Sequence, residues 1–361
     1  MIYLVIFFTL MITGIIFFSY GSLQVRIGSK LINVESTVYW FYVIILTCIL
    51  GFRGMSGTDT WTYQGAYSNL SAYQYFESGY RWLSLEAWNS GLSFEQFQIL
   101  MAFITMFLFA LAYSISVSNT VMALFFFVGT GVYYTLFNTM RQGMAEALFL
   151  LAVILFYRLS GWKKYIVTGI LIYLAYLFHV SVIVVVIMWI LSAIAWNIFG
   201  YRVQTFTILI SLLGILGVRI PVSKFSNLFS QMGLSYIDSY SEYLGDINYG
   251  LQGTVTILIF VAIVFLIGKR EKIFSSKIGQ ISYVLFLLYL ITSSVFGYVG
   301  LMNRFLNYFV PFFPILFVDL INNSRLKDRK ASIQLLIIFY LIIFMLYTLV
   351  GNYQGILPYR P

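Results

Sequence analysis

Long apolar runs recur along the whole chain and restrict its fold more strongly than any other feature. The run ILIFVAIVFLIG at 257–268 is apolar on every helical face, and a segment that crosses a bilayer must satisfy its backbone hydrogen bonds internally. The alternating pattern of a membrane β-barrel is absent. Charged residues make up 9% of the 361 positions, against roughly 25% in soluble domains. The sequence predicts an all-α, polytopic membrane protein and excludes water-soluble, disordered and disulfide-rich secreted proteins.

We expect about twelve transmembrane helices, each near or a little below the roughly 20 residues that cross hydrocarbon. They lie near residues 2–20, 34–52, 95–117, 119–137, 142–158, 163–178, 180–199, 204–219, 252–268, 279–297, 303–322 and 332–350. Residues 1–361 are expected to form a single integral membrane domain whose first run is retained as a span. The long loops 53–94 and 220–251 are expected to carry short helices, including an amphipathic one at 222–232.

The basic residues predict the orientation of these spans. If successive loops alternate sides, fourteen of the 21 Lys and Arg fall on one side with four of the 12 acids, which gives that side +10 and the other side −1. Cytoplasmic loops carry the excess of Lys and Arg. Both long loops and both termini are therefore expected on the outer side. The net charge of +9 reports topology, because nucleic-acid binding needs a basic stripe on a soluble face.

Four outer arginines run against this bias and need another explanation. They are Arg53, Arg141, Arg219 and Arg304, which stand at the ends of expected spans, and the three candidates for a ligand are Arg53, Arg141 and Arg304. Arginine offers a planar, permanently charged fork for phosphate or carboxylate. The alternative for each is that it snorkels to the interface or pairs with an outer acid.

Three residues are candidates for moving a proton on the outer side. His179 is the single histidine and lies in a tight turn between two spans; imidazole titrates near neutral pH, although a lone histidine is often structural. Asp59 would share a helix face with Tyr63, or cap that helix. Glu146 lies one turn below Gln142 on an apolar span, where a carboxyl group must be paired, protonated or in contact with water.

Aromatic and polar side chains on the outer side suit a sugar substrate. Flat rings beside acids offer an apolar platform and hydroxyl acceptors, while the same Tyr and Trp residues could instead form the interfacial belt. Pro311 and Pro314 are expected to kink the span near Arg304 and open space between helices. The candidates for glycan contact are Tyr63, Glu77, Gln142, Asn303 and Tyr308. The outer side has no D-x-D pair, so no metal or other cofactor is expected.

Five short motifs gather at the outer ends of the expected spans. They are FRGMSGTDTWTY at 52–63, FESGYRWL at 76–83, NTMRQGMAEAL at 138–148, LAYLFHVSVIV at 174–184 and NRFLNYF at 303–309. In order and placement they resemble the EpsG/Wzy family of bacterial exopolysaccharide and O-antigen polymerases. The resemblance implies a GT-C-like glycosyltransferase of the cytoplasmic (inner) membrane that joins repeat units carried on undecaprenyl pyrophosphate. In that chemistry we expect the three arginines to hold the pyrophosphate, and His179, Asp59 or Glu146 to assist the acceptor hydroxyl.

The same resemblance implies the partners and leaves alternatives open. Expected partners are the undecaprenyl-pyrophosphate-linked oligosaccharide, membrane lipid, and a flippase and chain-length regulator of the same pathway; nucleic acid is not among them. An O-antigen ligase would instead transfer the glycan to a lipid-A core. A lipid-linked oligosaccharide transporter would need polar groups along a whole pathway and inverted repeats. A membrane acyltransferase would need a catalytic histidine on the donor side.

Overall fold

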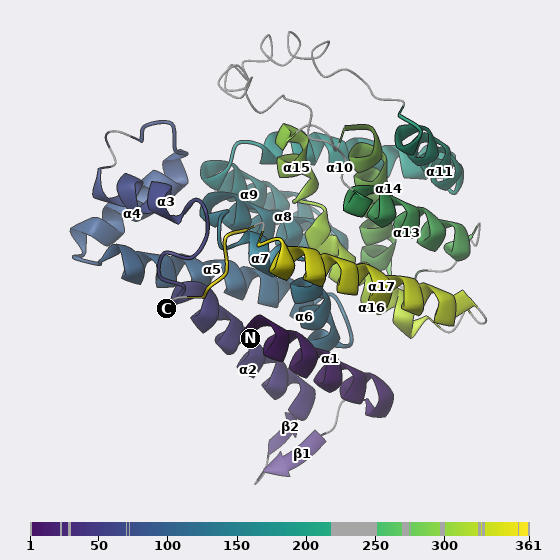
Figure 1. Ribbon diagram of the computed structural model, residues 1–361, viewed down its shortest axis with the longest axis horizontal. Helices are drawn as coiled ribbons and strands as arrows, with labels where there is room; N and C mark the ends of the chain where they lie inside the picture. Colours follow the sequence, from purple (N-terminus) through teal and green to yellow (C-terminus); the bar gives the residue numbers. More distant parts are fainter. Residues whose placement is uncertain are drawn as a thin grey trace. The chain divides into compact units, whose positions relative to one another are not determined.

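The computed structural model of the chain is almost entirely helical (Figure 1). It describes residues 2–359 except 22–23, 28–29, 70, 72, 218–250, 269–273, 275, 297–299, 324–325, 327–328 and 353. Within this range, eight helical segments are long and apolar enough to cross a membrane. They are α1 (Ile2–Tyr20), α2 (Val34–Gly51), α5 (Phe94–Ser114), α8 (Met140–Arg158), α10 (Val182–Phe199), α14 (Lys277–Phe296), Arg304–Asn322 and α17 (Arg329–Val350). The chain is a polytopic membrane protein; twelve spans and a GT-C-like arrangement stay predictions.

The remaining helices are shorter. The apolar ones are α6 (Thr120–Gly129), α11 (Arg202–Ile215) and α13 (Leu251–Ile267), and α9 (Lys163–Phe178) is of similar length. The helices α3 (Thr60–Ser68) and α4 (Ser78–Asn89) lie in the first long loop. The second long loop, with the expected amphipathic helix at 222–232, lies outside the described residues except at its last position.

Contacts divide the chain into two compact units. The first holds Met1–Ile183, Phe313–Val318 and Leu341–Pro361, and the second holds Val184–Phe312 and Asp319–Tyr340. In the second unit α11 packs on α14 and α13, and Gln204 on α11 donates a hydrogen bond of 2.8 Å to the carbonyl of Val264. The expectation of one integral membrane domain stays a prediction.

Among the long helices of the first unit (α1, α2, α5 and α8), α8 is the most enclosed. It packs against α5 on one side and α9 on the other, and every residue from Gln142 to Ile154 is buried. Its alanines, Ala145, Ala147 and Ala152, are fully buried, and small side chains let membrane helices approach closely. Helix α8 therefore gives the polar residues at its N-terminal end a rigid support.

Three local features differ from the simplest reading of the sequence. The run at 119–137 forms α6 and the short α7 (Val132–Thr135), because Gly131 adopts a left-handed backbone with a φ of 87° and ends the first helix. The run at 303–322 is likewise interrupted: α15 (Gly300–Leu306) ends before Pro311, and a 3-10 turn at Val310–Phe312 leads into α16 (Phe313–Asn322). The loop after α1 forms a hairpin of β1 (Gln24–Ile27) and β2 (Lys30–Asn33).

Candidate functional site

The site begins at the entry to α4, where a glycine lets two helices approach. Helix α4 packs on α9, and a Cβ atom added at Gly79 would lie 2.7 Å from the carbonyl oxygen of Leu177. A methyl group has no room there, so only glycine allows this approach without a shift. The contact brings Glu77, the residue before α4, to the turn that joins α9 and α10.

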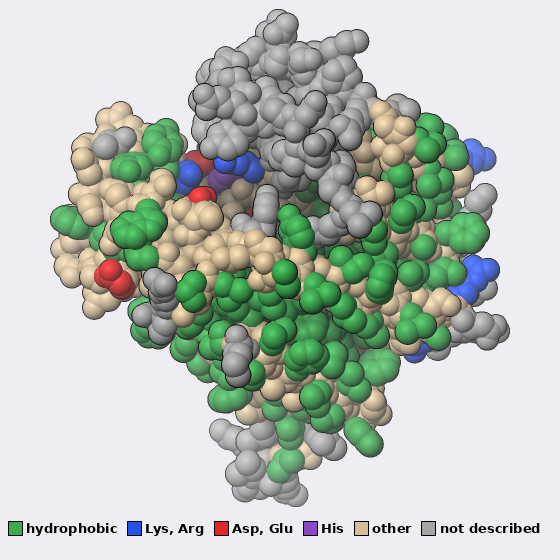
Figure 2. Space-filling model, viewed as in Figure 1, with side chains coloured by type: hydrophobic (Ala, Val, Ile, Leu, Met, Phe, Trp, Pro, Cys, Tyr) green, Lys and Arg blue, Asp and Glu red, His purple; other side chains and the backbone are tan. Residues whose placement is uncertain are grey.

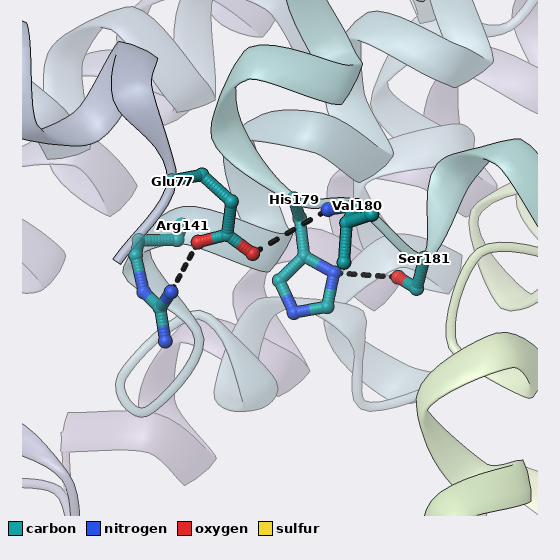
Figure 3. A network of polar contacts seen from close by, with 5 residues as sticks. All are labelled: Glu77, Arg141, His179, Val180 and Ser181. Carbon is teal, nitrogen blue, oxygen red and sulfur yellow. Dashed lines mark hydrogen bonds and ion pairs between the residues drawn. The ribbon is translucent and has the colours of Figure 1, made fainter. Parts of the chain in front are cut away.

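Glu77 bridges two segments that lie far apart in the sequence. Its Oε2 forms an ion pair with Nη1 of Arg141 at the start of α8, and its Oε1 accepts a hydrogen bond of 3.4 Å from the backbone N–H of Val180. Figure 3 shows the carboxylate between these two donors, with His179 beside it. We call Glu77, Arg141, His179, Val180 and Ser181 the Glu77 cluster.

His179 is held in a defined orientation within this cluster. It is buried, and its Nδ1 lies 2.5 Å from the hydroxyl oxygen of Ser181, as Figure 3 shows. In the tautomer whose Nδ1 donates to Ser181, Nε2 is the basic nitrogen of the ring. In the space-filling view the single purple side chain, His179, lies among blue and red ones on a mostly green and tan face (Figure 2). The turn thus places an imidazole next to an Arg–Glu pair.

The guanidinium of Arg141 packs over the faces of aromatic rings. Its Cζ lies 3.8 Å from the ring centroid of Phe76 and 5.9 Å from that of Tyr63. Phe76, Tyr63 and Tyr80 pack on one another with centroids 5.4–5.8 Å apart. A cation over an aromatic face is stabilised by the ring quadrupole. Tyr63, a glycan-contact candidate, is therefore a buried member of this support.

Arg53 lies in the loop after α2 and is not part of the Glu77 cluster, but Tyr63 and Tyr80 interact electrostatically with both Arg53 and Arg141. Its side chain is 1% exposed and Nη1 donates to the carbonyl of Leu50 at 3.1 Å, while Nε and Nη2 have no hydrogen-bond partner among the described residues. Burial lowers the pKa of Arg53 to about 10. A small cavity beside it, with a free volume of about 10 Å³, is lined by Leu50, Met101, Ala102, Thr105, Leu136, Thr139 and Met140.

The C-terminal segment holds the loop that contains Asp59. Asn138 donates two hydrogen bonds to Gln354, at 2.9 Å to its carbonyl and 2.6 Å to its side-chain oxygen, and accepts one of 3.4 Å from the backbone N–H of Asp59. The N–H of Gly57 donates to the carbonyl of Gly355 at 3.0 Å. Asp59 itself is exposed, accepts from Thr58 at 3.1 Å, and makes no side-chain cap to α3.

The other candidates occupy separate places. Gln142 donates to Glu146 at 2.8 Å within α8, and Glu146 is 1% exposed. Arg304 is half-buried on α15 and Tyr308 is fully buried in the turn after it; the backbone of Asn303 also lies in α15. These three belong to the second compact unit. The structure thus brings Arg141, Glu77 and His179 together, and their roles stay predictions.

Sequence reasoning missed the residues that shape the cluster. Phe76 and Gly79 flank Glu77 in the motif FESGYRWL, so the motif itself was the available signal. Val180 contributes only its backbone N–H, which donates to Glu77, so its residue type gives no signal in the sequence. In the described ranges, no group of three or more His, Cys, Asp or Glu side chains is arranged to hold a metal ion.

Comparison with known proteins agrees with the motif resemblance. The model of the EpsG family matches residues 36–360, which is most of the chain and includes all five motifs. No curated protein and no solved structure matches it. Membership rests on the family match, which supports a polysaccharide polymerase in general. The chain therefore belongs to the EpsG family.

Proposed function

We propose that this protein polymerises oligosaccharide repeat units carried on undecaprenyl pyrophosphate, at the outer face of the bacterial cytoplasmic membrane. The observation that carries the proposal is the Glu77 cluster, in which an arginine fork and an imidazole lie together at the end of a buried helix. A leaving pyrophosphate needs the first group and an acceptor hydroxyl needs the second. The excess of basic residues on the opposite side, which predicts that the first long loop lies outside, and the family match support the same reading.

The reaction divides between these two groups. The non-reducing-end hydroxyl of one unit attacks the anomeric carbon of the growing chain, so a new C–O bond forms while the bond to the pyrophosphate breaks. His179 takes the hydroxyl proton through Nε2. Arg141 stabilises the charge that develops on the undecaprenyl pyrophosphate as it leaves. Asp59 and Glu146 remain alternative bases, and the exposure of Asp59 and the enclosure of Glu146 in α8 favour His179.

Arg53 is proposed as a further contact of the pyrophosphate, and Arg304, on the second compact unit, stays a separate candidate for the same role. Two N–H groups of Arg53 have no acceptor among the described residues, and a buried polar group without a partner is costly unless a ligand uses it. Gln142, Tyr308 and Asn303 are proposed to contact the glycan. A flippase that delivers the repeat units and a regulator of chain length are the proposed protein partners.

Deleting the gene in its native host and separating the surface glycan on a gel tests the proposal. We expect the long-chain ladder to collapse to a single repeat unit, because flipping and attachment continue without polymerisation. Loss of all surface-attached glycan would instead indicate a ligase, and accumulation of repeat units on the cytoplasmic side would indicate a transporter.

Complementation with single variants then tests the residues. Arg141→Ala and His179→Ala should fail to restore the ladder at unchanged protein levels, whereas Arg81→Ala, on α4 but outside the cluster, should restore it. A ladder that survives both changes would refute the assignment of these residues.

A further inference from the structure

We propose that Glu77 is an internal anion that occupies the pyrophosphate position when no donor lipid is bound, and that the pyrophosphate displaces it. This inference rests on the proposed function, because it concerns how the same site is occupied and released. It assigns Glu77 a role in binding and product release in place of glycan contact.

The first argument is that the two donors around Glu77 form a site for a phosphate group. The Arg141 guanidinium and the Val180 N–H both bind the one carboxylate, on different oxygens. Val180 lies in the turn that joins α9 to α10 (Val182–Phe199), and turn N–H groups and arginine are both common donors to phosphate oxygens. A carboxylate already fills this position, which shows that the position accepts an anion.

The second argument is that the displaced carboxylate has another place to go. Glu77 is the N-cap residue of α4, with an extended backbone at φ −62° and ψ 150°, yet its side chain makes no cap hydrogen bond. Asp, Asn, Ser and Thr side chains at this position accept from the N–H groups two or three residues on, here Gly79 and Tyr80, and the longer Glu77 carboxylate can turn toward the same groups. Rotation of the Glu77 side chain would therefore replace its contacts with Arg141 and Val180 by hydrogen bonds from the first N–H groups of α4.

The third argument is that Arg141 keeps its place when Glu77 leaves. The guanidinium stacks on Phe76 at 3.8 Å, a contact that does not involve the carboxylate. The side chains of Arg141 and Glu77 are each 13% exposed, so a ligand can reach the pair. Glu77 thereby competes with the substrate, weakens its binding, and returns to the donors when the lipid product dissociates.

Direct binding to the purified full-length protein in lipid nanodiscs tests the exchange. Undecaprenyl pyrophosphate, undecaprenyl phosphate and inorganic pyrophosphate are titrated against wild type, Glu77→Gln and Glu86→Gln. Glu86 lies exposed on the same helix, so its substitution matches the change in charge without touching the cluster. We expect Glu77→Gln to bind undecaprenyl pyrophosphate about tenfold more tightly, equivalent to about 1.4 kcal/mol, and Glu86→Gln to bind like wild type.

The outcomes separate this inference from the proposed function. Wild-type protein that binds none of the three ligands refutes both. Wild-type binding with equal or weaker binding by Glu77→Gln overturns the exchange alone, because it makes Glu77 a structural partner of Arg141. A gain that extends to inorganic pyrophosphate shows displacement by the headgroup, and a gain confined to the lipid shows that the chain must also be anchored.

A second variant protects the test against misfolding. Glu77→Asp keeps the charge but shortens the side chain by one methylene, so it should weaken the pair and raise affinity in the same direction by a smaller factor. If Glu77→Gln does not fold, unchanged or reduced affinity in Glu77→Asp overturns the proposal.

Discussion

At the scale of single residues, the two candidate arginines of the first compact unit, Arg53 and Arg141, have opposite environments. Arg141 has a carboxylate partner and an aromatic platform. Arg53 is enclosed, and its Nε and Nη2 reach no hydrogen-bond acceptor in the described part of the chain. Arg141 is therefore held ready for a ligand, whereas the enclosed guanidinium of Arg53 carries a cost in stability.

The platform under Arg141 yields a first prediction. Phe76→Leu removes the ring face but keeps an apolar side chain, and a desolvated cation–π contact contributes up to about 2 kcal/mol. We expect the polymerisation rate on purified lipid-linked repeat units to fall about tenfold, and Phe76→Tyr, which keeps the ring, to stay close to wild type. Equal rates in the leucine variant and wild type would show that the stacking does not position Arg141.

The enclosure of Arg53 yields a second prediction. Burial lowers its pKa to about 10 because it disfavours the charged form, so at neutral pH the folded protein still contains a costly buried charge. The unfolded state binds the proton more tightly, and this cost is relieved only as pH rises above about 10. Arg53→Met should raise the free energy of unfolding by about 1–3 kcal/mol and abolish polymerisation.

Thermal unfolding in detergent measures the effect of Arg53→Met. Arg53→Lys keeps the charge without the planar fork and should show no gain in stability. A destabilised methionine variant would mean that the guanidinium stabilises the loop through its bond to Leu50.

At the scale of elements, the contact between α4 and α9 determines whether the Glu77 cluster exists. Because a Cβ at Gly79 would lie 2.7 Å from the backbone of Leu177, a methyl group there must push the two helices apart. Glu77 would then move away from Val180, since both residues lie at the ends of the helices in contact. The geometry of the Glu77 cluster therefore depends on residue 79 being glycine.

Gly79→Ala is therefore predicted to disrupt the cluster without unfolding the protein. We expect strongly reduced polymerisation at normal protein levels, and faster hydrogen exchange at the Val180 amide. Gly169→Ala is the matched control, since it lies exposed on α9 with nothing within 4 Å of an added Cβ. Normal activity in Gly79→Ala would contradict the requirement for this close approach.

At the scale of the whole molecule, the distribution of charge predicts which side of the membrane each loop faces. Basic residues concentrate at the side assigned to the cytoplasm, including Arg158 at the end of α8 and Lys163 and Lys164 at the start of α9. The first long loop, with α3, α4 and Glu77, is assigned to the outer side. Cys48 is the single cysteine, so the orientation is testable with one label at a time.

Cysteine labelling in spheroplasts tests this orientation. In a Cys48→Ala background, Ser90→Cys after α4 should react with a membrane-impermeant maleimide from outside. Ser160→Cys between α8 and α9 should react only after permeabilisation. Both serines are exposed, so a difference in labelling between the two cysteine variants reports the side of the membrane on which each residue lies. The reverse pattern would place the Glu77 cluster in the cytoplasm.

Sequence patterns predicted the elements better than the contacts between them. Each of the twelve expected spans overlaps at least one helix in the described residues, and 119–137 and 303–322 are interrupted, because apolar runs in lipid have no alternative to the helix. The breaks at Gly131 and before Pro311 follow from residue types that can be read locally. Arg141 and His179 come together because α8 and α9 pack on each other across a short connection at 159–162. The arrival of Glu77 beside them depends on the approach of α4 to α9, which no local pattern encodes.

The candidate site shows the same division. Arginines, a histidine and a carboxylate were identified by their side-chain chemistry and their expected outer placement. That Glu77 joins Arg141 to Val180, and that Phe76 supports the guanidinium, follows from distances between separate helices. Every residue except proline has a backbone N–H, so the residue type at position 180 does not identify Val180 as a donor.

The burial of α8 along its length has a consequence for the lipid environment. Membranes differ in hydrocarbon thickness, and helices that face lipid adjust to a mismatch by tilting or by moving their flanking residues. Helices α1 and α17, which are largely exposed along their lengths, would absorb such adjustments. Arg141 begins a helix shielded from the acyl chains, so the depth of the Glu77 cluster should stay constant as the surrounding bilayer thins or thickens.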